Sequence, residues 1–238
     1  MLAIKQLTVS YGKKTVIEDL SVCFGSAQVH GLAGLNGSGK TTLLNAIYGF
    51  KRSVSGSILY NDMPIRRNYL SFLETENHFY PNITGREYLS LFKPYGKESD
   101  EAWNRLFKLP LDSIVDGYSS GMKRKLALMA TLKQDKPVVI LDEPFNGLDM
   151  ESSRILNMLI NRLREKGRTV IVTSHILESL MGICDYIHYL NNQKIQFSRT
   201  KDQFGNIGGE MFHDMEAAYA EAIDEIIIMN TNTKIDTV

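Results

Sequence analysis

A glycine-rich loop constrains the fold of this chain more than any other segment. It has the pattern Gly-x-x-x-x-Gly-Lys-Thr and consists of Gly34, Leu35, Asn36, Gly37, Ser38, Gly39, Lys40 and Thr41, followed by Thr42. The apolar segment 28–33 before it predicts a buried strand, and the periodic run 41–47 after it predicts a helix. Strand, loop and helix in this order predict a phosphate-binding loop in an α/β fold, rather than a glycine-rich turn that only joins two elements.

The residue types of this loop suit a nucleotide triphosphate. Glycines let successive backbone N–H groups converge on a phosphate, and the N-terminus of the following helix adds a positive dipole. Lys40 is expected to bridge the β- and γ-phosphates, and the Thr41 hydroxyl is expected to bind Mg²⁺. Residues 34–42 are therefore the candidate ATP-binding residues.

Two adjacent acids follow another apolar segment, residues 138–141. Asp142 is a candidate Mg²⁺ ligand, and Glu143 is a candidate base for the attacking water. Ligands of open α/β sheets gather at the carboxyl ends of strands, where these acids are expected. Taken alone, they fit a solvated turn equally well; the phosphate loop favours the functional interpretation.

The remaining pattern predicts the architecture. Residues 2–10 and 15–24 alternate around a turn and predict an antiparallel pair, whereas 138–141 and 169–173 predict buried parallel strands joined by a helix at 150–166. We also expect a strand at 57–60, short strands from 185 to about 197, and helices at 84–92, 98–107 and 214–223, with a breaker at 93–96 and a frayed end at 230–238. The expected fold is a P-loop NTPase with a mixed, mainly parallel core sheet and an N-terminal antiparallel β subdomain. We expect one domain over 1–238, with an inserted α-helical subdomain at about 76–132 and a variable tail at about 199–238.

Composition excludes some classes of function. Lys+Arg and Asp+Glu both number 27, so the chain has no basic surplus for a nucleic-acid partner. The only two cysteines, Cys23 and Cys184, cannot form a disulfide framework and indicate a reducing compartment. No apolar run is long enough to cross a bilayer, so work at a membrane would need a separate spanning chain.

The segment Tyr118-Ser-Ser-Gly-Met-Lys-Arg-Lys-Leu126 precedes the acids and resembles the signature motif of ATP-binding cassette (ABC) transporter subunits. Ser119 and Gly121 match that motif, while Tyr118, Ser120 and Met122 depart from it in a way that resembles exporter-type cassettes. The alternative is an N-cap serine ahead of a basic amphipathic helix that binds no ligand. In the family the signature reaches the nucleotide held by a second subunit, so the resemblance implies an ATP-sandwich dimer.

The resemblance extends to single positions elsewhere in the chain. Tyr11 is similar to the aromatic residue that stacks on adenine, and His175 is similar to the switch histidine that contacts the γ-phosphate. Asp149 ends a segment, 146–149, that resembles the loop contacting the opposite subunit. Each also has a purely structural interpretation, as a packed tyrosine or as a cap.

One family position is not matched. Cassettes carry a glutamine before the inserted subdomain, and residues 73–81 contain none. Alignment on Tyr80-Pro81 puts Thr75 at that position, flanked by Glu74 and Glu76. Which of these three residues substitutes as a metal ligand stays open at this point.

The implied function is ATP binding and hydrolysis, with Mg²⁺, on the cytoplasmic face of a membrane. The implied partners are a second ABC subunit, as a homodimer or a heterodimer, and an integral-membrane permease that docks near Glu74–Pro81, with Phe79 and Tyr80 as apolar contacts. The signature and the short inserted lobe favour export. The alternatives are a soluble non-transport ABC ATPase and a regulatory nucleotide-binding module.

Overall fold

The computed structural model describes residues 1–52, 54–92, 99–213, 216, 219–220, 223 and 227. It contains two compact units, Met1–Lys201 and Asp202–Val238. The 3₁₀-helix Lys201–Asn206 is followed by helical residues 207–213. The helix expected at 214–223 lies largely outside the described residues, although Glu216, Tyr219, Ala220 and Ile223 are helical. The breaker at 93–96 and the end at 230–238 lie outside them.

A six-stranded sheet forms the centre of the first unit, in the order β10-β9-β3-β8-β7-β6. All neighbouring pairs are parallel except β10 with β9, so the sheet is mixed and mainly parallel, as expected. Every residue of β3, β7 and β8 is buried, which fits strands covered on both faces. The strands are β3 (Val29–Ala33), β6 (Leu70–Leu73), β7 (Val138–Leu141), β8 (Thr169–Thr173), β9 (Tyr186–Asn191) and β10 (Lys194–Thr200).

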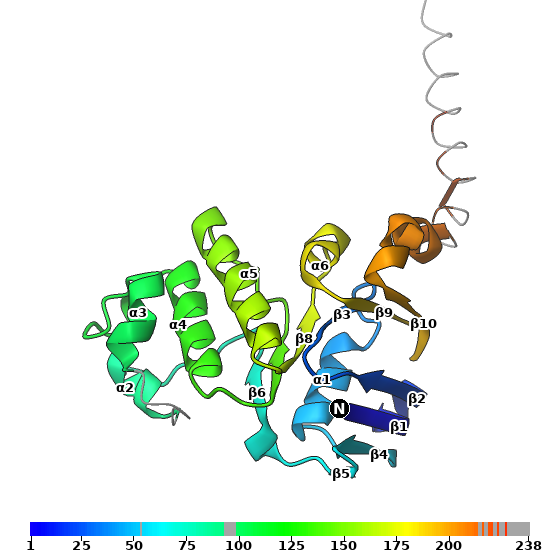
Figure 1. Ribbon diagram of the computed structural model, residues 1–238, viewed down its shortest axis with the longest axis horizontal. Helices are drawn as coiled ribbons and strands as arrows, with labels where there is room; N and C mark the ends of the chain where they lie inside the picture. The colour runs from blue at the N-terminus through cyan, green and yellow to red at the C-terminus, as the bar shows by residue number, and fades with distance from the viewer. Residues whose placement is uncertain are drawn as a thin grey trace, which may run out of the picture. The chain divides into compact units, whose positions relative to one another are not determined.

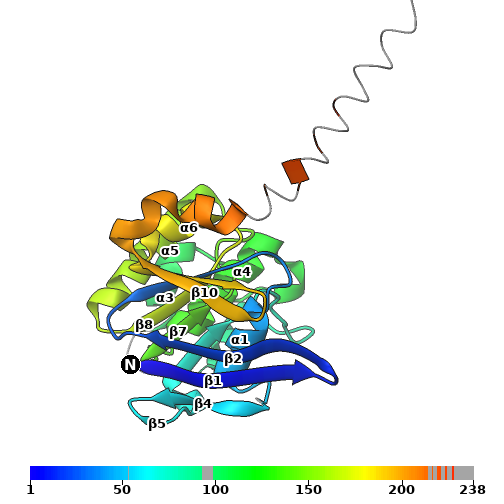
Figure 2. The same cartoon turned by 90° about the vertical axis from the view of Figure 1, so that its right-hand side faces the viewer.

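A second, antiparallel sheet has the order β2-β1-β4-β5. Its strands are β1 (Leu2–Tyr11), β2 (Lys14–Phe24), β4 (Ser55–Tyr60) and β5 (Met63–Pro64). Helix α1 (Lys40–Tyr48) buries Leu43, Leu44 and Ile47 in one cluster with apolar residues of both sheets. Figure 2 shows β1, β2, β4 and β5 as a layer with α1 behind it. This packing fixes the start of α1 next to the carboxyl ends of the core strands.

Three helices between β6 and β7 form what we call the helical lobe: α2 (Gly85–Ser90), α3 (Asp100–Phe107) and α4 (Ser120–Leu132). Each begins at a side-chain cap, namely Thr84 in a capping box with Glu87, Ser99 and Ser119. The lobe has its own apolar cluster, built around residues such as Leu89 and Leu126. In Figure 1 the lobe lies at the opposite end of the first unit from the antiparallel sheet.

Two helices connect the remaining parallel strands. Helix α5 (Met150–Glu165) joins β7 to β8 and ends before Gly167, whose φ of 81° suits a left-handed cap. Helix α6 (Leu177–Ile183) joins β8 to β9. The sequence did not predict α6, β5, β6 or the 3₁₀-helices Arg67–Tyr69 and Val115–Gly117, all of which are seven residues or shorter. Within the described part of the chain, no helix has the length and apolarity needed to cross a bilayer.

Two histidines are buried inside the core sheet. His30 on β3 and His188 on β9 are 2% and 3% exposed, and their rings meet at 3.1 Å between Nδ1 of His30 and Nε2 of His188. His188 Nδ1 also lies 2.7 Å from the Ser198 hydroxyl of β10, and the Phe24 ring meets both imidazoles edge-on. Burial lowers the pKa of His30 to about 4 and that of His188 to about 3. The pair therefore stays neutral in the folded protein near pH 7.

Candidate functional site

The glycine-rich loop joins β3 to α1, as expected. Gly37 and Gly39 have φ angles of 81° and 107°, in the region that favours glycine. A Cβ atom at Gly34 would lie 2.4 Å from the Leu190 carbonyl oxygen, so a side chain there would push the loop away from β9. The Ser38 hydroxyl is buried and has no hydrogen-bond partner among the described residues. A turning backbone with a spare hydroxyl suits an anionic ligand.

Lys40 is the first residue of α1 and is buried against its own loop. Its ammonium donates to the carbonyl oxygens of Gly34 at 2.7 Å and Leu35 at 3.2 Å. Burial lowers the pKa of Lys40, while the negative charges of Glu143 and Asp142 oppose that shift. The loop therefore holds the Lys40 amine close to both acids.

Asp142 follows β7 directly and is 1% exposed. Its Oδ2 accepts hydrogen bonds from the hydroxyls of Thr41 at 2.9 Å and Thr75 at 2.8 Å, and its Oδ1 accepts one from Thr173 at 2.6 Å. These three hydroxyls come from α1 and from the ends of β6 and β8. One carboxylate and two hydroxyls meeting at a single oxygen form the hard, all-oxygen donor set that Mg²⁺ prefers.

Glu143 contacts His175 across the ends of β7 and β8. The Oε2 atom of Glu143 lies 2.9 Å from Nδ1 of His175 and accepts from the His175 backbone N–H at 3.3 Å. The Glu143 N–H donates to the Thr173 hydroxyl at 2.8 Å. Glu143 has a φ of 48°, a left-handed conformation that is unfavourable for a residue with a side chain. Surrounding contacts therefore fix the direction of this carboxylate.

One cavity of about 290 Å³, which we call the nucleotide cavity, is lined by most of the candidate nucleotide-binding residues. It is lined by Val16, Asn36, Gly37, Gly39, Lys40, Thr41, Thr42, Thr75, Asp142 and Glu143. A neighbouring cavity of about 340 Å³ shares Val16, Asn36 and Gly37 and adds Leu35 and Ser38. Tyr11 lines neither; its ring is half-exposed and carries the Lys51 ammonium 4.0 Å from its centre. His175 joins the site only through Glu143.

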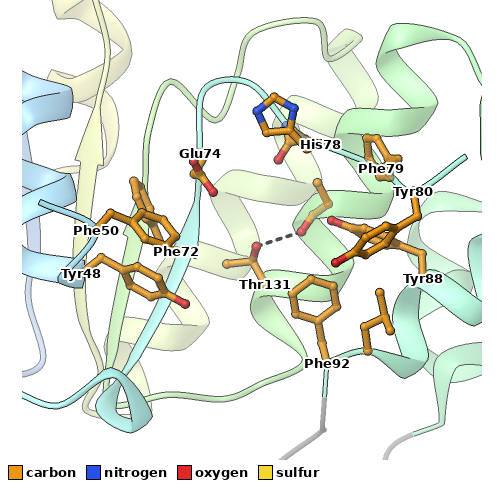
Figure 3. Close-up of a pocket in the computed structure, with 13 residues that line it drawn as sticks. Tyr48, Phe50, Phe72, Glu74, His78, Phe79, Tyr80, Tyr88, Phe92 and Thr131 are labelled. Atoms are coloured by element: carbon orange, nitrogen blue, oxygen red, sulfur yellow. Dashed lines mark hydrogen bonds between the residues drawn. The ribbon is translucent and has the colours of Figure 1, made fainter.

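The structure separates the three candidates for the missing glutamine. Thr75 lines the nucleotide cavity and contacts Asp142, whereas Glu74 faces a different cavity of about 500 Å³ and Glu76 lines neither. Figure 3 shows Glu74 among the side chains that line this second cavity, on the same side as Phe72 and opposite Tyr88. Partial burial raises the pKa of Glu74, with Asp142 adding to the shift and His78 opposing it. The geometry favours Thr75 as the residue that acts at the nucleotide.

The signature residues lie apart from the nucleotide cavity of their own subunit. Ser119 caps α4 by accepting from the Met122 N–H at 3.2 Å, and Ser120 is exposed beside it. A Cβ atom at Gly121 would lie 2.9 Å from the Gly147 carbonyl oxygen, so this glycine permits a close approach between α4 and the segment before α5. None of the four signature residues lines the nucleotide cavity or the neighbouring cavity of about 340 Å³.

Asp149 forms intrasubunit contacts in addition to its predicted role in a dimer. It caps α5 by accepting from the Ser152 N–H at 2.7 Å, and its Oδ2 pairs with the Lys125 ammonium of α4 at 2.7 Å. The hydrogen bond from Lys125, with that from Ser152, holds the pKa of Asp149 well below its usual value.

Sequence reasoning missed Val16, Thr173 and Arg124, and of these Arg124 makes the most contacts with the site. It is 5% exposed, and burial lowers its pKa to about 10, so it stays charged near neutral pH. Its guanidinium donates to four carbonyl oxygens at the ends of β6 and β7. A basic residue on the buried face of a predicted amphipathic helix was the available signal.

Comparisons with known proteins place this geometry in a family. The family model described as "ABC transporter" matches residues 17–146, more than half of the 238 residues. The lantibiotic transport ATP-binding protein SrtF of Streptococcus pyogenes is 30% identical over 223 residues, covering 90% of this chain and 96% of the relative. The linearmycin resistance ATP-binding protein LnrL of Bacillus subtilis is 30% identical over 227 residues, covering 88% and 73%.

Solved structures agree with these sequence relatives. An ATP-binding subunit of an ABC transporter superposes with a TM-score of 0.79 at 27% identity, covering 93% of this chain and 98% of that one. A dimeric bacterial ABC transporter cassette superposes with a TM-score of 0.75 at 20% identity, covering 84% and 99%, and supports the fold alone. The expected P-loop NTPase fold is confirmed. This chain therefore belongs to the ABC transporter family and is one of its ATP-binding ATPase subunits.

Proposed function

We propose that this chain hydrolyses ATP in order to power a separate membrane-spanning permease, in the direction of export. The observation that carries the proposal is the single cavity in which Lys40, Thr41, Asp142 and Glu143 meet at the glycine loop. The printed names of relatives support the direction: one acts in lantibiotic transport, one in linearmycin resistance and one in Nod factor export.

Within that cavity the residues have different roles. The backbone N–H groups of the loop and the Lys40 ammonium bind the phosphates, because they present positive charge where the glycine-rich backbone turns around an anion. The donor set that fits Mg²⁺ is the Thr41 hydroxyl, the Asp142 carboxylate and the Thr75 hydroxyl. The ion, when bound, neutralises charge on the β- and γ-phosphates.

Glu143 accepts the proton of the attacking water. Its carboxylate reaches the cavity from a fixed turn, and the His175 imidazole and N–H hold one of its oxygens. The other oxygen is left for the water. His175 orients Glu143 when its N–H is on Nδ1 and donates to the γ-phosphate when its N–H is on Nε2, because a neutral imidazole carries a single N–H.

The site needs a second subunit to be complete. Ser119, Ser120, Gly121 and Met122 lie outside their own cavity, so they would bind the γ-phosphate of a partner's nucleotide, and Asp149 would contact the partner beside them. Structures related to this fold are described as dimeric, one of them as a post-hydrolysis state bound to ADP and phosphate. The second subunit is either a second copy of this chain or a different ABC subunit.

The permease would dock at the aromatic cavity between the core and the helical lobe. Phe79 and Tyr80 line this cavity together with Glu74, and Tyr80 is exposed (Figure 3). Exposed aromatic side chains around a hollow are typical of protein interfaces. The ATPase and its transport partner would then lie at the cytoplasmic face of a membrane.

Substitution Glu143→Gln tests the assignment of the base. We expect ATP to bind as in the parent and phosphate release to fall by at least about 10²-fold, since a general base contributes about 10²- to 10⁴-fold. Glu165→Gln, on an exposed pair with Arg162 in α5, is the matched control and should hydrolyse at the parent rate. Normal turnover by the Glu143→Gln protein would reject Glu143 as the base.

A second measurement tests the site as a whole. Lys40→Ala should weaken the binding of radiolabelled ATP strongly, because it removes the only cationic side chain that lines the nucleotide cavity among the described residues. Unchanged affinity would remove the basis of the proposal. Absence of phosphate release from the parent protein would instead favour a regulatory nucleotide-binding module.

A further inference from the structure

Among the described residues, the hydrogen bonds of the Arg124 side chain all go to main-chain carbonyl oxygens. Its Nη1 donates to the carbonyl oxygens of Glu74 at 2.6 Å and Thr75 at 3.2 Å, and its Nη2 donates to those of Asp142 and Glu143, both at 2.7 Å. One buried guanidinium thus joins the end of β6 to the end of β7. Both segments carry residues of the nucleotide cavity.

This arrangement determines the backbone conformation at the acids. Successive carbonyls in an extended strand point to opposite sides, so one donor can bind two of them only where the chain turns. Nη2 binds the carbonyls of both Asp142 and Glu143, and Glu143 has the left-handed φ of 48° that such a turn requires. The guanidinium therefore stabilises an unfavourable conformation that directs the Glu143 carboxylate.

The same side chain places Thr75. Nη1 binds the carbonyls of Glu74 and Thr75 where the chain leaves β6, and the Thr75 hydroxyl there lies 2.8 Å from Asp142 Oδ2. A lysine could not replace this bridge, because an ammonium is a compact charge whereas a guanidinium spreads its donors across a rigid plane.

We propose that Arg124 is a positioning residue for ATP hydrolysis. It fixes the turn that carries Asp142 and Glu143 and the turn that carries Thr75, and it ties both to α4, the helix that begins at the signature. A displacement of α4 is thereby transmitted to the acids of the same subunit. This inference rests on the proposed function of the nucleotide cavity.

Arg124→Lys is the decisive variant because it keeps the charge and removes the planar fork. We expect kcat for ATP to fall by at least about 10-fold, since displacing a reacting group by about 1 Å can cost about 10²-fold. The KM for ATP should change less than kcat, because Arg124 does not contact the phosphate loop and reaches the Mg²⁺ donor set only through the backbone of Thr75 and Asp142. Amide hydrogen exchange should accelerate at Asp142 and Glu143.

Lys133 provides a matched control on the same helix. It is also 5% exposed, at the end of α4, and donates to the Leu89 carbonyl oxygen and the Asp100 carboxylate within the helical lobe. Lys133→Gln should lower the melting temperature and leave kcat per folded molecule and the exchange of the Asp142 amide at their parent values. This control distinguishes the effect of losing a buried positive charge from the effect of displacing Asp142, Glu143 and Thr75.

Chemical rescue provides a second test of the role of Arg124. Guanidinium ion added to Arg124→Ala should restore part of kcat, and methylammonium at the same concentration should not. A folded Arg124→Lys protein with parent kcat and parent amide exchange would overturn the proposal, as would parent kcat in Arg124→Ala. A parent protein that releases no phosphate would refute the proposed function, while amide exchange would still decide the role of Arg124.

Discussion

Acidification should destabilise the protein through the buried pair of His30 and His188. Burial lowers their pKa values from 6.5 to about 4 and about 3, so the unfolded chain binds protons that the folded chain excludes. The contribution of the two histidines to folding stability is retained above pH 6.5. It is lost as the pH falls below that value, until the histidines of the folded protein themselves take up protons.

The size of the effect follows from these pKa values. Between pH 7 and pH 5 an unfolded histidine takes up most of one proton, while the folded residues stay almost entirely neutral. Linkage gives about 2 kcal/mol for each residue and about 4 kcal/mol for the pair. This is a large share of the stability of an ordinary domain, which is about 5–15 kcal/mol.

Urea unfolding at pH 7, 6 and 5 measures this loss, and the midpoint should fall by about 1 M or more across the series. The double variant His30→Gln, His188→Gln should be less stable at pH 7 but should lose about 4 kcal/mol less on acidification. Ser198→Ala removes the hydroxyl beside His188 and no titrating group, so it should keep the parent pH dependence. Equal losses in the parent and the double variant would refute the reasoning.

Three further outcomes are expected. Gly34→Ala should abolish tight ATP binding measured by equilibrium titration, because its Cβ atom would lie 2.4 Å from the Leu190 carbonyl oxygen; affinity equal to the parent's would contradict this. Asp149→Ala should lower the melting temperature through loss of the α5 cap, and an unchanged melting curve would argue against that contribution. Thr75→Val should raise the Mg²⁺ concentration needed for half-maximal phosphate release, since it removes a hydroxyl 2.8 Å from Asp142 Oδ2; Thr75→Ser should restore the parent value, and identical Mg²⁺ curves for all three proteins would exclude Thr75 from the metal site.

Local sequence signals predicted the elements that carry the nucleotide cavity. The short apolar segments before Gly34 and before Asp142 predicted buried strands, and the structure has β3 and β7 there. The motif spelling then predicted most residues that line the cavity. Leu35 and Ser38 line the neighbouring cavity instead, and Gly34, Tyr11 and His175 line neither. The roles of these residues remain predictions.

Other features depend on which strands are neighbours in the sheets. A single amino-acid sequence does not reveal this order. His30 and His188 meet only because β9 lies beside β3, although 158 positions separate them. Strand β6 has four residues, and its Ser71 is buried, so it shows no pattern of its own. The choice of Thr75 over Glu74 and Glu76 required the turn after β6, and the role of Arg124 required knowing which carbonyls it would meet.

The two carbonyl oxygens that hold Lys40 determine how it can contribute to affinity. An ammonium has three N–H donors, and two of them donate to the Gly34 and Leu35 carbonyls, so one is left for a phosphate oxygen. A hydrogen bond from that donor to a charged oxygen is stronger than one to a neutral acceptor. Because the carbonyls restrict the side chain, little of its conformational entropy is lost when ATP binds.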